Sequence, residues 1–131
     1  MKIAVDTNVL LRAIVADDEE QADKAVDLFN TASMVAVSLQ TLCEMVWVLS
    51  FSYKVSRDDI AFAILTLLNT GNIVLNRPAA EAGLAMLEAG GDFADGVIAW
   101  DGRFLGGEKF VSFDKKAVSL LTKQGHAAQL L

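Results

Sequence analysis

The stretch IAVDTNVL, residues 3–10, decides the expected fold, because a short apolar run ends there at an acid and a helical pattern follows. We predict a buried strand over residues 3–5, ended by Asp6, and a short helix over residues 8–15. The same alternation continues along the chain. Further strands are expected at 34–37, 73–75, 110–113 and 127–130, and further helices at 19–32, 39–51, 56–69, 78–88, 93–104 and 115–123. This order predicts an α/β fold with a mostly parallel central sheet of four to five strands flanked by helices.

The length and composition indicate one domain over residues 1–131, since no repeat, linker or low-complexity tract interrupts the chain. No apolar run reaches the roughly 18 residues of a membrane helix. A secretory leader is not recognisable, and the single cysteine, Cys43, excludes a disulfide framework. We therefore expect a cytoplasmic protein without a membrane segment.

The net charge of -6 argues against a protein that binds nucleic acid mainly through a basic face. It leaves metal-assisted phosphodiester chemistry open, because acids that hold divalent cations present positive charge to a phosphate. The basic residues available for an RNA backbone are expected to be mostly solvated surface charges. They are Lys54, Arg57, Arg103, Lys109, Lys115 and Lys116.

Four acids interrupt apolar sequence: Asp6, Glu44, Asp95 and Asp114. Asp6 and Asp114 follow predicted strands, and ligands of open α/β sheets bind outside the carboxyl ends of strands. The helices that carry Glu44 and Asp95 are expected to begin at that same edge. Converged carboxylates repel one another and are costly to desolvate, so a divalent cation would stabilise them. Mg²⁺ and Mn²⁺ prefer such oxygen ligands.

Each of these acids also has a structural interpretation. Asp6 and Asp114 are suited to cap the helices that follow them, and Asp95 to the first turn of a helix capped by Asp92. Glu44 lies in an apolar stretch, and an acid is rarely buried without a partner. The structural interpretation of Glu44 is a partly exposed position on its helix.

Four segments, in order and at fitting intervals, resemble the motifs of the PIN-domain family, and within it the VapC-type toxins of toxin–antitoxin pairs. They are IAVDTNVL at 3–10, VSLQTLCE at 37–44, DFADGVIA at 92–99 and VSFDK at 111–115. The similarity covers nearly the whole chain. Trp100 departs from the pattern, because a smaller residue is more usual at that position of the third motif.

The resemblance implies a Mg²⁺- or Mn²⁺-dependent endoribonuclease that cleaves structured RNA such as tRNA or rRNA. Asp6, Glu44, Asp95 and Asp114 would hold the metal, and Asn8 and Ser112 would support the metal shell or the phosphate. Asp92 would support the site or cap its helix. The resemblance further implies a cognate antitoxin that masks the site, and a homodimer.

Two other functions compete with this one. An aspartyl-phosphate enzyme would need a second acid two residues after Asp6, where the chain has Asn8. A non-catalytic PIN-like binding module would have no need of the four acids. A histidine-based mechanism would depend on His126, the only histidine, and no nucleophile lies in a recognisable elbow.

The aromatic residues Trp47, Phe51 and Tyr53 are expected in the core or, alternatively, in a groove for the antitoxin.

Overall fold

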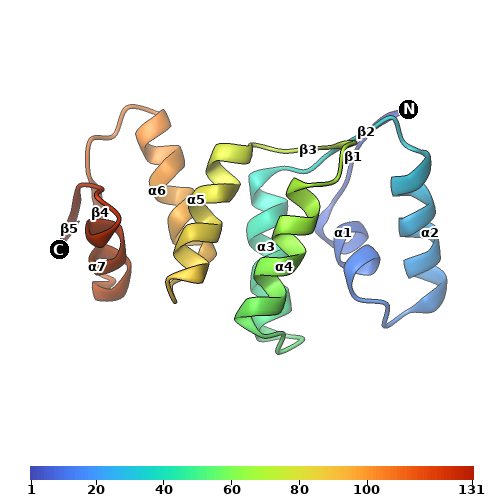
Figure 1. Cartoon of the computed structure of the whole chain (residues 1–131), viewed down its shortest axis with the longest axis horizontal. Coiled ribbons are helices and arrows are strands. Elements are labelled where there is room, and N and C mark those ends of the chain that lie inside the picture. Colours follow the sequence, from blue (N-terminus) through green and yellow to red (C-terminus); the bar gives the residue numbers. More distant parts are fainter. The chain divides into compact units, whose positions relative to one another are not determined.

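The computed structural model describes all residues, 1–131, and they form two compact units. The first unit is Met1–Asn76 and the second is Arg77–Leu131. Both units contain helices and parallel strands (Figure 1).

The first unit is built on a three-stranded parallel sheet in the order β1-β2-β3. Its register aligns Ile3 with Val35 and Val35 with Ile73, so the carboxyl ends of the three strands lie at one edge. The elements in chain order are β1 (Lys2–Ala4), α1 (Thr7–Ile14), α2 (Glu19–Thr31), β2 (Met34–Ala36), α3 (Leu39–Phe51), α4 (Arg57–Leu68) and β3 (Ile73–Val74).

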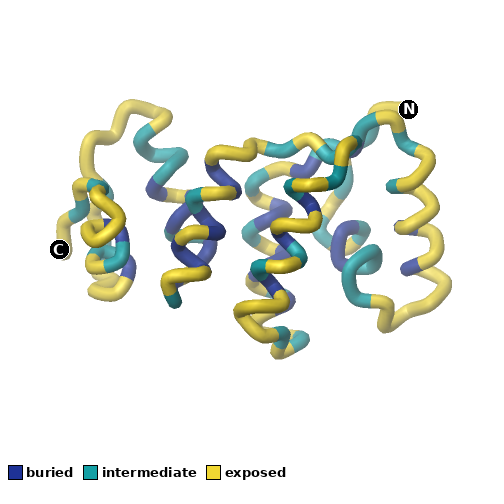
Figure 2. The backbone as a smooth tube through the Cα atoms, in the orientation of Figure 1, coloured by how far each residue is buried: buried dark blue, intermediate teal, exposed yellow.

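The core of the first unit lies where the helices face one another and the central strand. Leu10 of α1, Val35 of β2 and Leu42 of α3 are fully buried, and Ile60 and Ile64 of α4 are nearly so. Apolar residues recur at helical spacing on the inner faces of α3 and α4, which explains their packing side by side (Figure 2). Burial of these side chains is the main source of the unit's stability.

The second unit contains a two-stranded parallel sheet and three helices. They are α5 (Arg77–Glu88), α6 (Phe93–Phe104), β4 (Phe110–Ser112), α7 (Lys115–Lys123) and β5 (Ala128–Leu130). Glycine allows α5 and α6 to approach closely. A Cβ on Gly96 would lie 2.4 Å from the carbonyl oxygen of Ala82, and one on Gly83 would lie 2.7 Å from the ring of Phe93. Phe93 is fully buried at this contact.

The predicted α/β class with parallel strands is confirmed, and the strands and helices lie where the sequence predicts them, to within one or two residues. The five strands form sheets of three and two, however, and not one central sheet of four to five. Each strand has only two or three residues, so it offers few backbone N–H and C=O groups for pairing with another strand. The strand β4 is paired with β5. None of the seven helices combines the length and apolar character needed to cross a bilayer.

The expectation that Trp47 and Phe51 belong to the core is wrong. Their side chains are 60% and 59% exposed, and the two rings pack on each other with centroids 5.3 Å apart. Helix α3 buries Leu42, Met45, Val46 and Leu49 on its inner face, and Trp47 and Phe51 lie on the opposite, exposed side.

Candidate active site

Asp6 lies at the junction between β1 and α1, two residues after the strand ends. It is the N-cap of α1, and its Oδ1 accepts a hydrogen bond of 3.0 Å from the backbone N–H of Val9. Ser38 occupies the matching position after β2, where it caps α3. The register pairs Ala4 with Ala36, so these two caps lie at the same edge of the sheet. The capping interpretation of Asp6 is therefore correct, and its Oδ2 remains for another ligand.

Glu44 lies in the second turn of α3 and is exposed. The hydroxyl of Thr7 donates a hydrogen bond of 2.8 Å to Oε2 of Glu44, across 37 residues of sequence. Because Thr7 directly follows Asp6, this bond brings the carboxylate of Glu44 to the beginning of α1. The first unit thus joins Glu44 to the residue that directly follows Asp6, and the meeting of the two carboxylates themselves stays a prediction.

Asn8 is exposed on the first turn of α1 and lines a pocket between α1 and α2 with Val9 and Arg12. Its side-chain amide offers both a donor and an acceptor beside Asp6. That chemistry suits the predicted support of a metal shell or a phosphate, which stays a prediction.

Three acids lie near one another in the second unit. Asp92 caps α6 by accepting a 3.2 Å hydrogen bond from the N–H of Ala94, and Asp95 lies in the first turn of the same helix. Partial burial raises the pKa of Asp95, and the negative charges of Asp92 and Asp114 raise it further. The local structural interpretations of Asp92 and Asp95 are therefore correct, and Asp95 carries the electrostatic cost that a cation would relieve.

Asp114 caps α7 with one oxygen, since Oδ1 accepts hydrogen bonds from the N–H groups of Lys116 and Ala117 at 2.9 and 3.1 Å. The hydroxyl oxygen of Ser112 accepts a 3.0 Å hydrogen bond from the N–H of Asp114. This bond shapes the turn from β4 into α7 and thereby directs the Asp114 side chain. The predicted role of Ser112 toward a metal or phosphate stays a prediction.

The predicted set of four carboxylates is divided between the units, two in each. No group of three or more His, Cys, Asp and Glu side chains in the structure is arranged to hold a metal ion. The convergence of all four acids stays a prediction.

The chemistry of the donors fits a hard divalent cation. The ion pairs Arg12–Asp17, Lys24–Glu20 and Arg77–Glu81 do not involve Asp6, Glu44, Asp95 or Asp114. Each of the four is a carboxylate, which is the ligand type that Mg²⁺ and Mn²⁺ prefer. The four acids therefore supply the kind of oxygen donors that such a cation would need.

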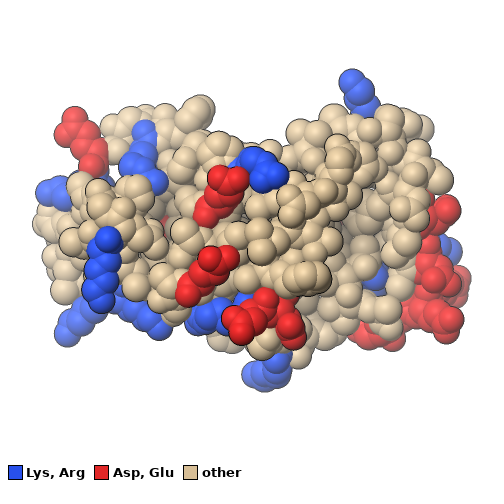
Figure 3. All heavy atoms as spheres, in the orientation of Figure 1, with Lys and Arg blue, Asp and Glu red and all other residues tan.

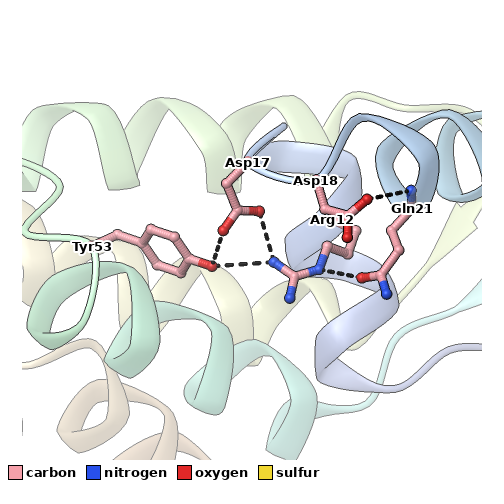
Figure 4. A network of polar contacts seen from close by, with 5 residues as sticks. All are labelled: Arg12, Asp17, Asp18, Gln21 and Tyr53. Atoms are coloured by element: carbon pink, nitrogen blue, oxygen red, sulfur yellow. Dashed lines mark hydrogen bonds and ion pairs between the residues drawn. The ribbon is translucent and has the colours of Figure 1, made fainter.

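A polar network that the sequence did not predict joins α1 to the ends of neighbouring elements (Figure 4). Nη1 of Arg12 donates to Oδ1 of Asp17 at 2.7 Å and to the hydroxyl of Tyr53 at 3.2 Å. The Tyr53 hydroxyl donates to Oδ2 of Asp17 at 2.9 Å, and Nε of Arg12 donates to Gln21 at 2.7 Å. The bond from Tyr53 and the charge of Arg12 lower the pKa of Asp17. No local pattern signals these contacts, since Tyr53 lies 36 residues from Asp17.

His126 is unsuited to carry the chemistry alone. Partial burial lowers its pKa, and the nearby charge of Arg103 lowers it further, so the imidazole is held in its neutral form near pH 7. No hydrogen bond of its side chain to a nucleophile is present among the side-chain contacts of the structure.

The family model for the PIN domain matches residues 3–120. The chain belongs to the PIN-domain family. The match covers all four motifs and reaches into both units, ending within α7 of this PIN domain. Members of the family are typically nucleases that use divalent metal ions, which agrees with the oxygen donors at the two strand-to-helix junctions. No curated protein matches the sequence.

Proposed function

We propose that this PIN domain is a Mg²⁺- or Mn²⁺-dependent endoribonuclease and the toxin of a VapBC-type pair, cleaving structured RNA such as tRNA or rRNA. The observation that carries the proposal is the bond from Thr7 to Glu44, because it ties Glu44 to the residue that directly follows Asp6. A nuclease needs paired carboxylates to bind a cation, whereas a binding module has no use for them. Asp95 and Asp114 complete the proposed ligand set, so that all four acids come from one domain over residues 1–131.

A bound divalent cation would supply a water of lowered pKa as the nucleophile and positive charge for the phosphate. The residues of the chain orient the groups around it. Thr7 fixes Glu44, the cap to Val9 fixes Asp6, and the turn at Ser112 fixes Asp114. Asn8 offers its amide to a phosphate oxygen, and Asp92 secures the start of the helix that carries Asp95.

The distribution of charge supports a route for RNA over the second unit. Residues 77–131 hold six lysines and arginines and seven acids, whereas residues 1–76 hold five and ten. If Asp95 and Asp114 are left out as proposed metal ligands, the second unit has more basic than acidic residues. We assign the phosphate contacts to Arg103, Lys109, Lys115 and Lys116, which lie close to the third and fourth motifs.

The deciding experiment compares the wild type with Asp6→Asn and Glu44→Gln on a mixture of tRNA and rRNA, with Mg²⁺ or Mn²⁺ and then with EDTA. We expect cleavage by the wild type alone, and its loss with EDTA. Asp18→Asn is the matched control, because Asp18 also caps a helix, α2, and lies outside the proposed ligand set. Equal activity of all variants would contradict the proposal, and absence of any cleavage would favour the non-catalytic module.

A cytoplasmic location is part of the proposal, and the proposed antitoxin and homodimer are tested separately. Co-expression with a small neighbouring gene should relieve growth arrest caused by this chain, and light scattering should give the mass of a dimer. A monomer at all concentrations, or growth arrest that no adjacent gene relieves, would contradict these two parts of the proposal.

A further inference from the structure

The side chain of Phe113 is the most exposed aromatic group of the chain, at 78%. It lies between the end of β4 and Asp114, the N-cap of α7. The structure contains two pairs of packed aromatic rings, and neither pair includes this side chain: Trp47–Phe51 and Trp100–Phe104. The ring of Phe113 is therefore open to contact by a ligand.

The backbone on both sides of Phe113 is held in place. The hydroxyl of Ser112 accepts a 3.0 Å hydrogen bond from the N–H of Asp114, and this bond closes a turn with Phe113 at its centre. The carbonyl oxygen of Ser112 accepts a 2.9 Å hydrogen bond from the N–H of Leu131, at the end of the neighbouring strand. An ordered backbone lowers the entropic cost of binding through the side chain that it carries.

Phe113 lies beside the acids of the second unit. Asp114 follows it directly, and the negative charges of Asp114 and Asp92 both act on Asp95 at the start of α6. A phosphate bound through a cation at these acids would therefore lie close to the ring. Since only a ribose separates a base from its phosphate, the base next to that phosphate comes within reach of Phe113.

Lysines are placed around the ring. Residues 109–116 contain three lysines and one acid, and basic side chains gather around α7 in Figure 3. Nζ of Lys116 lies 4.0 Å from the point where a Cβ would stand on Gly90, so the ammonium group reaches the turn that leads to α6. Nζ of Lys109 donates a 2.7 Å hydrogen bond to Oε1 of Gln129 on the adjacent strand. Basic groups for the phosphates and a ring for the bases are the combination that binds single-stranded nucleic acid.

We propose that Phe113 determines specificity by stacking its ring on the base next to the phosphate that the acids of the second unit bind through a cation. A base inside a duplex is already stacked on its neighbours, so the base on Phe113 must be unpaired and turned outward. Lys115 and Lys116 hold the flanking phosphates. The inference rests on the proposed function, because it takes RNA as the substrate of this site.

The test measures binding of three labelled ligands to the full chain by fluorescence anisotropy. Ca²⁺ replaces Mg²⁺, because it also takes oxygen ligands, and a gel checks that the RNA stays intact. The ligands are a single-stranded oligoribonucleotide of about 12 nucleotides, the same sequence in a perfect duplex, and a sugar–phosphate strand of equal length without bases. Phe113→Leu should weaken binding of the single strand about tenfold and leave the other two ligands unchanged, since neither offers a free base.

Three further variants locate the effect. Phe113→Trp keeps an aromatic ring and should bind the single strand as tightly as the wild type. Phe104→Leu removes a ring of similar exposure, 73%, from the far end of α6, and should leave binding of all three ligands unchanged. Lys116→Gln should weaken all three ligands by a similar factor, because each of them carries phosphates.

Unchanged binding of the single strand by Phe113→Leu would overturn the proposal. An equal loss for all three ligands, together with a lower Tm, would overturn it in favour of a structural role for the ring. Loss of a dimer in light scattering, with RNA binding intact, would assign Phe113 to an interface between copies of the chain and overturn it as well.

RNA cleavage with Mg²⁺ is measured in parallel on the same proteins. The expected binding pattern in a protein that cleaves no RNA would sustain base stacking and refute only the nuclease. Cleavage by Phe113→Leu at the rate of the wild type would refute the role of Phe113 and leave the nuclease standing.

Discussion

The hydroxyl of Thr7 donates a 2.8 Å hydrogen bond to Oε2 of Glu44 and so joins the start of α1 to the second turn of α3. The bond connects two motifs that are separated by 37 residues. It gives Thr7, which the motif places beside Asp6, a specific task as a positioning residue for a carboxylate of the proposed site.

Replacing Thr7 by valine keeps the shape of the side chain and removes the donor to Glu44. Hydrogen bonds to charged groups contribute about 1.5–3 kcal/mol, so we expect kcat to fall by about 10- to 100-fold. KM should change little, because the substrate contacts are untouched. Thr7→Ser retains the hydroxyl and should restore most of the activity. Equal rates for Thr7→Val and the wild type would show that Glu44 needs no such support.

The carboxylate of Asp95 is predicted to destabilise the metal-free protein at neutral pH. Its native pKa is raised above 3.8 by burial and by the charges of Asp92 and Asp114. The stability contributed by protonated Asp95 is present below the unfolded pKa and is lost as the pH rises through the native pKa. Asp95→Asn should therefore raise Tm in EDTA, and the increase should be larger at pH 7 than near pH 4. The same variant should abolish RNA cleavage in the presence of metal.

The control for this effect is Asp101→Asn, which removes an acid from the same helix, α6. We expect a smaller change in Tm and retained cleavage. A Tm difference for Asp95→Asn that is the same at pH 7 and pH 4 would contradict the electrostatic explanation.

Tyr53→Phe is predicted to weaken the link between α1 and the segment after α3. The change removes the donor that, with Arg12, lowers the pKa of Asp17 below 3.8. A lowered pKa contributes stability above the unfolded value, and this contribution is lost as the pH falls through the native pKa. Tm should thus be lower than in the wild type at pH 7, and the difference should narrow below about pH 3.8.

Gln21→Ala is the matched control for Tyr53→Phe. It removes another partner of Arg12 without touching the bond from Tyr53 to Asp17. We expect the pH profile of its Tm to follow that of the wild type. If the pH profile of Tm changes as much in Gln21→Ala as in Tyr53→Phe, the pH-dependent loss of stability would be due to Arg12 and not to the bond from Tyr53 to Asp17.

The close approach of α5 and α6 predicts opposite effects for two glycines of one helix. Gly96→Ala would place a Cβ 2.4 Å from the backbone oxygen of Ala82, and such overpacking costs about 1–3 kcal/mol or more. Gly102 has nothing within 4 Å of the added Cβ, and alanine is the better helix former by about 1 kcal/mol. Urea unfolding should show Gly96→Ala destabilised and Gly102→Ala stabilised. Destabilisation of both would indicate that helix propensity does not decide the result at Gly102.

The elements and their beginnings were determined by the sequence itself, because capping is local. Asp6, Ser38, Asp92 and Asp114 each accept a hydrogen bond from an N–H two or three residues ahead, so the pattern of a cap before an apolar period is sufficient. The order of motifs likewise indicated the family and the four acids of the candidate site. These features depend only on residues that are neighbours along the chain.

Tertiary structure alone decided the relationships between distant residues. The bond from Thr7 to Glu44, the contact of Tyr53 with Asp17, the exposure of Trp47 and the division of the strands into sheets of three and two were not evident in the sequence. The face that a helix buries, and the strand that another strand pairs with, depend on the packing of all elements at once. Local propensity carries no information about that choice, because a helix or strand forms equally well against several partners.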